Sequence, residues 1–387
     1  MTSDLKISRR SDVPPFRVMD VMADAARLEA QGRHIIHMEV GEPGLPTPDQ
    51  ALAVGKAAMD RGETGYTLAL GRNELRARIA QYYGDAHDLD IAPSRVIVTT
   101  GSSSAFSLAF LSAFDAGDDI ALSRPGYPAY GRIMRGLGLG VRDLDTDITT
   151  RFQPTADQVL AEEDLAGLLL ASPSNPTGSV IEDARLRDLC AACDDAGIRL
   201  ISDEIYHRMT FDGPAQTALA FNDNAIIINS FSKYYCMTGW RVGWMVVPEN
   251  LVRPIERLTQ NFFISPPTIS QIVAEETFNC TVELDQRVLG YKANRDAMVA
   301  ALQGAGVQSI APPDGAFYLY ADMSPFTDDS EAFCRDMLEG AGVAAVTGLD
   351  FDDVNGGNFV RFSIAGAQDA INEGASRLGD WLPRQKR

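Results

Sequence analysis

The residue best placed to do chemistry is Lys233, which follows closely on an apolar run at residues 225–228 that predicts a buried strand. Burying an ammonium group costs free energy, so a lysine at the end of such a strand is unusual. Its amine is better explained as a covalent attachment point, as in a Schiff base with pyridoxal phosphate, with Ser230 and Arg241 holding the phosphate. A surface-loop lysine beside the glycine turn at residues 239–243 explains these residues equally well.

Another apolar run, residues 96–100, is followed by Ser102 and Ser103, which open an apolar helix. Free N–H groups and hydroxyls at the start of a helix can bind an anion. Taken alone, an ordinary N-cap is the simpler interpretation. The position is informative because ligands of open α/β sheets bind at the carboxyl ends of the strands.

Polar or aromatic residues follow three further apolar runs in the same way. Tyr127 could stack on a planar ring, and Asn175 could donate a hydrogen bond to an oxygen on that ring. Asp203 could face a pyridine nitrogen and keep it protonated, which makes the ring an electron sink. A packed loop aromatic, a proline turn and a helix N-cap are the respective alternatives. Together, however, these residues predict a complete pyridoxal-phosphate site.

The elements that must position these residues follow an alternating pattern. From about residue 48, helices alternate with short strands, which we predict at residues 96–100, 119–123, 168–171, 199–202, 225–229 and 242–247. Several have apolar cores without polar alternation, as strands buried on both faces do. This rhythm predicts an α/β fold in which helices wrap a mostly parallel sheet.

After about residue 280 the pattern changes to that of a smaller α+β domain. We predict helices at 282–302 and 330–340, and strands at 312–320 and 359–364. An N-terminal helix at 18–31 and a strand at 35–40 should join this domain. The predicted division is therefore 1–47 as an N-terminal part of the small domain, 48–280 as the large domain and 281–387 as the small C-terminal domain.

The composition of the chain limits the kinds of binding partner and the cellular compartment that we expect for the protein. A net charge of −19 argues against a nucleic-acid partner, because phosphate binding favours a basic surface. Five scattered cysteines suggest free thiols in a reducing cytoplasm, and the four histidines show no metal-type spacing. The start of the chain has no signal-like apolar region, and no apolar run is as long as a membrane span.

The chain resembles the fold-type I, class I/II pyridoxal-phosphate-dependent aminotransferases (the aspartate aminotransferase-like superfamily) along nearly its whole length. The matching motifs, in chain order, are Val40-Gly41-Glu42-Pro43, Gly65-Tyr66-Thr67 with Gly71, Ser174-Asn175-Pro176-Thr177-Gly178, Ser202-Asp203-Glu204-Ile205-Tyr206, Ser230-Phe231-Ser232-Lys233 with Arg241, and Val360-Arg361-Phe362-Ser363. The resemblance implies a large domain with a mostly parallel seven-stranded sheet and a smaller α+β domain.

The same resemblance implies roles for residues around the cofactor ring. Lys233 is implied to form the aldimine and then to shuttle a proton between the substrate Cα and the cofactor. Asp203 is implied to pair with the pyridine nitrogen. Asn175 and Tyr206 would bond the ring oxygen and lower the pKa of the aldimine, while Tyr127 would stack on the ring.

The resemblance also implies residues that hold the phosphate and the substrate. The phosphate ligands would be Ser102, Ser103, Ser230 and Arg241. Tyr66 would reach the cofactor phosphate of a neighbouring subunit, which makes the expected active unit a homodimer. Arg361 would clamp the substrate α-carboxylate, with Gly41 and Asn175 near it.

Transamination between an L-amino acid and a 2-oxo acid, by a ping-pong mechanism, is the function that the resemblance predicts. A C–S β-lyase or a decarboxylase would use the same cofactor and the same proton-removing step. A non-catalytic effector sensor is a third possibility, but such proteins usually carry a DNA-binding module, and the residues before Gly41 leave little room for one. A nicotinamide-binding Rossmann domain does not fit, because no GxGxxG motif follows an early strand.

The substrate stays open at this stage. Arg17 could bind a distal carboxylate of the substrate or could be a surface residue, and Phe16 and Tyr66 could instead line a more apolar pocket. Aspartate, alanine, aromatic and branched substrates are all compatible, with glutamate and 2-oxoglutarate expected for one half-reaction. Closure of the small domain over the substrate is expected, since Arg361 and Lys233 lie in different predicted domains.

Three positions depart from the usual family pattern. Tyr127 stands where some members carry Trp, and either ring can stack. Cys236 replaces a smaller residue such as Gly or Ala, for which we expect only local repacking. Phe351 and Asp352 replace the Phe-Gly found in many members after Gly348, which leaves the shape of that loop undetermined.

Overall fold

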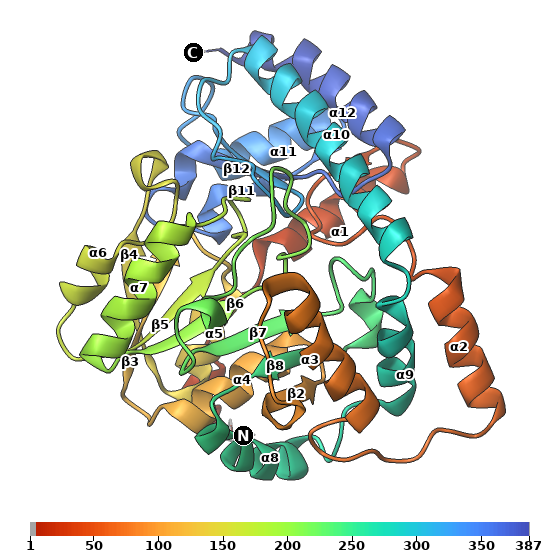
Figure 1. Cartoon of the computed structure of the whole chain (residues 1–387). Helices are drawn as coiled ribbons and strands as arrows, with labels where there is room; N and C mark the ends of the chain where they lie inside the picture. The colour runs from red at the N-terminus through yellow and green to blue at the C-terminus, as the bar shows by residue number, and fades with distance from the viewer. Residues whose placement is uncertain (1–4, 387) are drawn as a thin grey trace.

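A computed structural model describes residues 5–386 and shows a large domain built on a seven-stranded sheet, with a smaller domain beside it (Figure 1). The strand order is β2-β8-β7-β6-β5-β3-β4. The strands are β2 (Val96–Thr99), β3 (Asp119–Arg124), β4 (Gly140–Asp145), β5 (Leu165–Ala171), β6 (Arg199–Asp203), β7 (Ile226–Ser230) and β8 (Gly243–Val246). Strand β8 is antiparallel to both neighbours, and the other neighbouring pairs are parallel. The predicted α/β class is confirmed.

The six strands predicted in this sheet are all present, with ends shifted by a few residues. Strand β4 has no counterpart in the sequence prediction. It lies at the edge of the sheet and is mostly polar or partly exposed, so the continuous apolar signal of a buried strand is missing.

Apolar side chains of the central strands pack on both faces of the sheet, which explains their unbroken apolar runs. In β7, Ile226 and Ile228 join one core cluster and Ile227 joins the other. The first cluster lies under helices α4 (Ser102–Ala113), α5 (Ala129–Leu137) and α8 (Glu249–Phe262). The second lies under α3 (Asn73–His87) and α7 (Asp183–Ala196). The sheet is thus the middle layer of three.

The small domain contains a three-stranded antiparallel sheet and a two-stranded parallel one. The former has the order β11 (Val346–Thr347), β12 (Phe359–Ser363) and β9 (Tyr318–Asp322), and the latter pairs β1 (Ile36–His37) with β10 (Val343–Ala344). Because β1 pairs with β10, the N-terminal segment joins the C-terminal one, as predicted. The strand predicted at 312–320 begins only at Tyr318, since the preceding residues form a loop whose backbone bonds to the large domain through Phe211 and Gly178.

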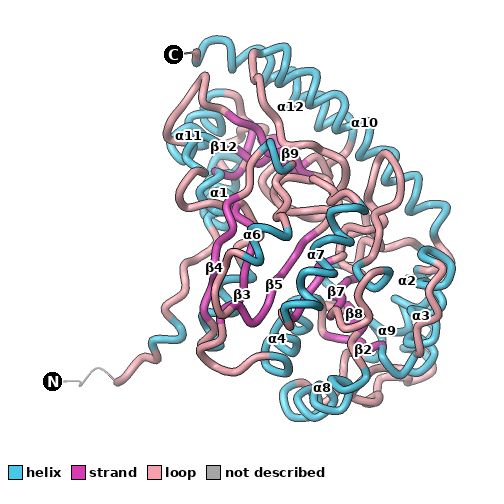
Figure 2. Tube along the Cα trace, turned by 60° about the vertical axis from the view of Figure 1, so that its left-hand side comes forward, coloured by secondary structure: helices cyan, strands magenta, loops and turns pink. Residues whose placement is uncertain are grey.

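The remaining helices complete both domains. They are α1 (Arg17–Glu29), α2 (Asp49–Asp60), α6 (Ala156–Leu160), α9 (Thr268–Thr277), α10 (Thr281–Ala305), α11 (Ser330–Gly340) and α12 (Gln368–Trp381), with short 3-10 turns between elements. Helix α10 packs along α12 in the small domain and extends toward α9 and α2 at the side of the large domain (Figure 2). The predicted domain boundaries at residues 47/48 and 280/281 stay predictions.

The described residues contain neither a membrane-spanning helix nor a cluster of metal-ligating side chains. No helix in the range 5–386 is both long enough and apolar enough to cross a membrane. Within the same range no group of three or more His, Cys, Asp or Glu residues is arranged to hold a metal ion.

Cys236 occupies an unusual backbone position. Its φ is 54°, in the left-handed region that favours glycine, and its carbonyl accepts a hydrogen bond from the Thr47 hydroxyl at 2.8 Å. The expectation of side-chain repacking alone is therefore incomplete, because a side chain at this position also strains the backbone. Glycine would fit this conformation at lower cost.

Candidate active site

A cavity of about 410 Å³ lies where the carboxyl ends of the central strands meet the small domain. Ten of the twelve predicted site residues line it, namely Gly41, Ser102, Ser103, Tyr127, Asn175, Asp203, Tyr206, Lys233, Arg241 and Arg361. They come from positions as far apart in the chain as 41 and 361. The two that do not line it are Tyr66 and Ser230.

Lys233 stands just beyond β7, with its amine inside the cavity. Its Nζ donates a hydrogen bond to the carbonyl of Gly41. Removal from water, with a smaller effect of the nearby Arg361 guanidinium, lowers the pKa of the Lys233 amine to about 8. A larger share of this amine is therefore uncharged and nucleophilic at neutral pH than in an ordinary lysine.

Asp203 ends β6 and is only 4% exposed. Its Oδ2 accepts a hydrogen bond from the Tyr130 hydroxyl at 2.5 Å, and its Oδ1 accepts one from the Ile205 N–H at 3.1 Å. Burial raises the pKa of Asp203 to about 6, and both hydrogen bonds oppose that rise. A buried carboxylate held in this way favours a cationic N–H donor, which a protonated pyridine nitrogen provides.

The N-terminus of α4 and Arg241 form an anion-binding end of the cavity. Gly101 caps this helix at φ 81° and has no side chain to occupy the free N–H groups of the first turn. A Cβ at Gly101 would lie 2.3 Å from Nη2 of Arg241, so only glycine allows the guanidinium this close. No ion pair found among residues 5–386 involves Arg241. This end fits a phosphate group.

Ser230, a predicted phosphate ligand, does not itself line the cavity. The Ser230 Oγ lies 3.2 Å from the Val242 carbonyl oxygen and 2.9 Å from the Ser232 Oγ, and its one proton can go to either; Ser230 is only 1% exposed. Ser232 lines the cavity in its place. The predicted contact between Ser230 and a phosphate stays a prediction, and Ser232 offers a second hydroxyl close to it.

Tyr66 lies on the loop between α2 and α3 and is 84% exposed. It is outside the cavity of its own chain, so its predicted contact would have to involve a second subunit. That contact stays a prediction.

Arg361 projects from β12 into the cavity and is 5% exposed. Its Nη1 donates to Asn175 Oδ1 at 3.0 Å, its Nη2 donates to the Glu39 carbonyl at 2.5 Å, and its Nε has no partner. The guanidinium lies over the rings of Tyr318 and Phe351, 4.6 and 4.7 Å from their centroids. No carboxylate in the described part of the chain pairs with it, so a carboxylate ligand would supply the missing counter-charge.

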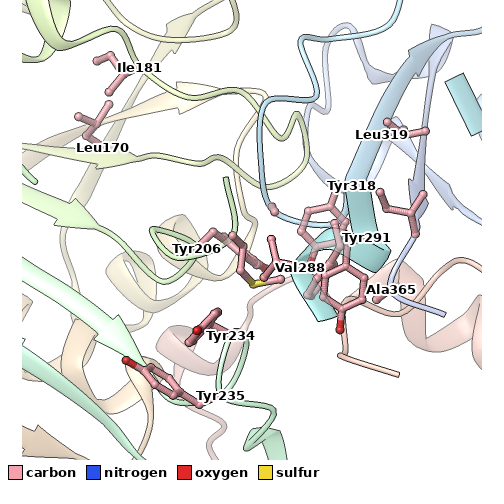
Figure 3. Close-up of a cluster of buried hydrophobic side chains, with 14 of the residues drawn as sticks. Leu170, Ile181, Tyr206, Tyr234, Tyr235, Val288, Tyr291, Tyr318, Leu319 and Ala365 are labelled. Atoms are coloured by element: carbon pink, nitrogen blue, oxygen red, sulfur yellow. Dashed lines mark hydrogen bonds between the residues drawn. The ribbon is translucent and has the colours of Figure 1, made fainter. Parts of the chain in front are cut away.

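Two aromatic residues at the site are absent from the sequence prediction. Tyr130 donates a hydrogen bond to Asp203. In the sequence, the only feature that could have indicated this role is its position three residues after Tyr127. Tyr318 holds Tyr206, since their hydroxyls are 2.9 Å apart within a buried apolar cluster to which both domains contribute (Figure 3). The Tyr318 hydroxyl also packs so closely on Gly41 that a Cβ there would lie 2.1 Å from it.

Apolar side chains make up much of the lining besides the polar groups described above, and we call this part the apolar end of the cavity. Its lining includes Phe16, Val18, Met19, Met22 and Phe351. Arg17 does not line this cavity, because its guanidinium pairs with Glu331 near the surface. Of the two roles left open for Arg17, the surface one fits the structure.

Comparison with known proteins gives one consistent result. The model of the family "Aminotransferase class I and II" matches residues 33–378. The chain is 46% identical over 98% of its length to valine–pyruvate aminotransferase of Mycobacterium tuberculosis, covering 99% of that protein. It is also similar to the crystal structure of an aminotransferase from the same organism (TM-score 0.96, 44% identity) and to that of a putative aminotransferase from Silicibacter pomeroyi (TM-score 0.93, 48% identity). Each of these two structural matches covers 98% of this chain and 100% of the other chain.

Proposed function

We propose that this chain, which belongs to the class I and II aminotransferases, moves the amino group of a small apolar L-amino acid to pyruvate. As a family member it is a pyridoxal-phosphate-dependent transaminase that acts on amino acids and 2-oxo acids. The β-lyase and decarboxylase alternatives are not favoured. The proposal concerns the identity of the substrates and the roles of individual residues.

The distribution of charged side chains around the cavity is the observation that supports an apolar substrate side chain. The cationic side chains that line it in residues 5–386 are Lys233, Arg241 and Arg361, and each is needed near the cofactor or the α-carboxylate. The remaining end is apolar and includes the carboxylate of Asp350. A substrate with a second carboxylate would meet no free cation there. Valine or alanine fits better, and the name of the 46% identical relative supports this choice.

The cofactor fits the polar groups of the cavity. We propose that Lys233 is its attachment point, that Asp203 faces its pyridine nitrogen, and that Asn175 and Tyr206 bond its ring oxygen. Tyr127 would stack on the ring. The proposed phosphate ligands are Ser102, Ser103, Ser232 and Arg241, with Ser230 supporting Ser232 from behind. When bound, pyridoxal phosphate supplies a ring that accepts the electron pair released as the substrate Cα loses its proton.

The chain itself binds the substrate and moves one proton. Arg361 would hold the α-carboxylate in a bidentate pair, because its Nε–H is free and each terminal nitrogen, which donates one hydrogen bond, keeps a second N–H. The amine of Lys233, with its lowered pKa, would accept the proton that the substrate Cα loses and would later give it up again. Enclosure between two domains keeps water from competing in this step.

A spectroscopic titration tests the substrates. Valine or alanine should bleach the visible band of the lysine-bound cofactor, and pyruvate should restore it. Aspartate should act at least about 100-fold more weakly, since a buried charge left without a partner is strongly rejected. Equal bleaching by aspartate and valine, or recovery with 2-oxoglutarate but not with pyruvate, would contradict the proposal.

A homodimer, a cytoplasmic location and the domain boundaries complete the proposal. Exposed apolar side chains on segments near Tyr66, namely Leu68, Phe262 and Ile264, support an interface with a second copy. The five cysteines, all free, are compatible with a reducing compartment.

Mixing two variants tests the contribution of Tyr66 across the interface. In a heterodimer of Tyr66→Ala and Lys233→Ala subunits, one site combines an intact Lys233 with an intact Tyr66. We therefore expect reassociation of the two weakened variants to restore up to half of the wild-type activity per heterodimer. If the mixture is no more active than its separate components while heterodimers form, Tyr66 does not act across an interface.

A further inference from the structure

A second cavity, of about 450 Å³, lies directly behind the apolar end of the active site. The two cavities share Tyr127, Pro128, Tyr130, Asp350 and Phe351 in their linings. Asp350, at the end of the turn Gly348–Asp350, therefore stands in the wall between them. Arg132, on α5, lines only the second cavity.

Asp350 and Arg132 form a buried ion pair across this wall. Arg132 Nη2 lies 3.0 Å from Asp350 Oδ1, and the side chains are 14% and 2% exposed. The same oxygen accepts the Arg17 N–H at 3.4 Å, so the carboxylate also holds the start of α1. The Arg132 guanidinium lies 4.5 Å over the ring of Phe16, which itself lines the active site. The pair is thus close to the place where a substrate side chain would end.

Arg132 still has donor capacity to spare. Its buried Nη1 has no hydrogen-bond partner, and within residues 5–386 Asp350 is the one carboxylate that forms an ion pair with it. Arg124, in the same cavity, differs because it is surrounded by four carboxylates, those of Asp143, Asp145, Asp352 and Asp353. Unlike Arg124, Arg132 is paired with a single carboxylate, and its guanidinium lies against a ring that lines the active site.

We propose that the Asp350–Arg132 pair determines substrate specificity by excluding dicarboxylates. Asp350 presents a carboxylate to the substrate end and occupies Arg132. A second substrate carboxylate there is repelled by Asp350 and finds no free cation. The inference rests on the proposed function, in that it explains why apolar amino acids would be preferred. It also predicts a latent dicarboxylate site, because neutralising Asp350 leaves Arg132 charged, buried and open to a new anion.

The test compares holoenzymes with and without the charge of Asp350. In Asp350→Asn the ratio of kcat/KM for aspartate to kcat/KM for valine should rise at least about 10-fold. The dissociation constant of succinate, read from the cofactor absorption, should fall by a similar factor. Adding Arg132→Met should reverse both changes. Asp353→Asn, on the same loop but 87% exposed, is the matched control and should leave both quantities near wild type.

The outcomes separate this inference from the proposed function. The wild-type ratio tests the proposed substrates, whereas the change caused by Asp350→Asn tests the pair. An unchanged ratio and an unchanged succinate constant in a folded Asp350→Asn protein overturn the inference. If that variant fails to fold, Arg132→Met in the wild-type background decides. Asp350 then keeps its charge, so succinate should bind no better than to wild type, and tighter succinate binding to Arg132→Met overturns the inference.

Discussion

Replacing Lys233 by alanine is expected to lower kcat by more than about 10⁴-fold while leaving the fold intact, since the variant loses both the attachment point and the base. The loss of the side chain removes one hydrogen bond, to the Gly41 carbonyl, and relieves the cost of burying an ammonium group. Single-turnover kinetics with valine and a thermal unfolding curve would measure the two effects separately.

Two variants sharpen this result. Lys233→Arg keeps a positive charge but cannot offer a neutral amine, because guanidinium does not deprotonate in proteins, so it should be as inactive as alanine. Lys292→Ala removes a lysine that pairs with Asp212 at the surface of the molecule and should retain wild-type rates. If Lys233→Ala keeps its rate within tenfold of wild type, the proposed role of Lys233 is wrong.

The sequence predicts the sheet and much of the site for the same physical reason. Strands buried on both faces appear as unbroken apolar runs, and polar residues that follow them gather at one edge of a parallel sheet. Asn175, Asp203 and Lys233 follow three neighbouring strands and do line one cavity. Arg361 comes from the other domain and was reached only through the family resemblance.

What the sequence does not predict depends on side-chain direction and on contacts between distant segments. Ser230 is the last residue of β7 and pairs with Gly243, so the register of the sheet fixes its direction. Ser232, in the turn beyond, lines the cavity, and no sequence pattern distinguishes the two. The Arg132–Asp350 pair joins residues 218 positions apart, and neither lies in a motif that marks it.

The second large effect is expected for Asp203→Asn, whose kcat should fall by about 10³-fold or more. The variant is nearly isosteric, so the buried position stays filled. A neutral amide, however, cannot stabilise a proton on the pyridine nitrogen, and the ring then accepts electrons poorly. Tyr130→Phe is the informative comparison, because it keeps the carboxylate and removes only the hydroxyl that donates to it at 2.5 Å. Its kcat should fall by about 10- to 100-fold, the effect of losing one hydrogen bond to a charged group.

The pH dependence of cofactor binding shows whether the ionised form of Asp203, and not only its position, is needed at this site. Burial places the pKa of Asp203 at about 6 in the chain alone, and the Tyr130 hydrogen bond holds it below the value that burial alone would give. Binding of a protonated pyridine favours the ionised carboxylate, so the cofactor affinity of the wild-type apoprotein should weaken as the pH falls through about 6. In Tyr130→Phe the pKa of Asp203 rises, so the same weakening should begin at a higher pH. In Asp203→Asn this inflection should be absent, because no carboxylate titrates. A Tyr130→Phe inflection at or below the wild-type pH would mean that Tyr130 does not stabilise the charged form of Asp203, whereas an inflection retained in Asp203→Asn would assign it to another group.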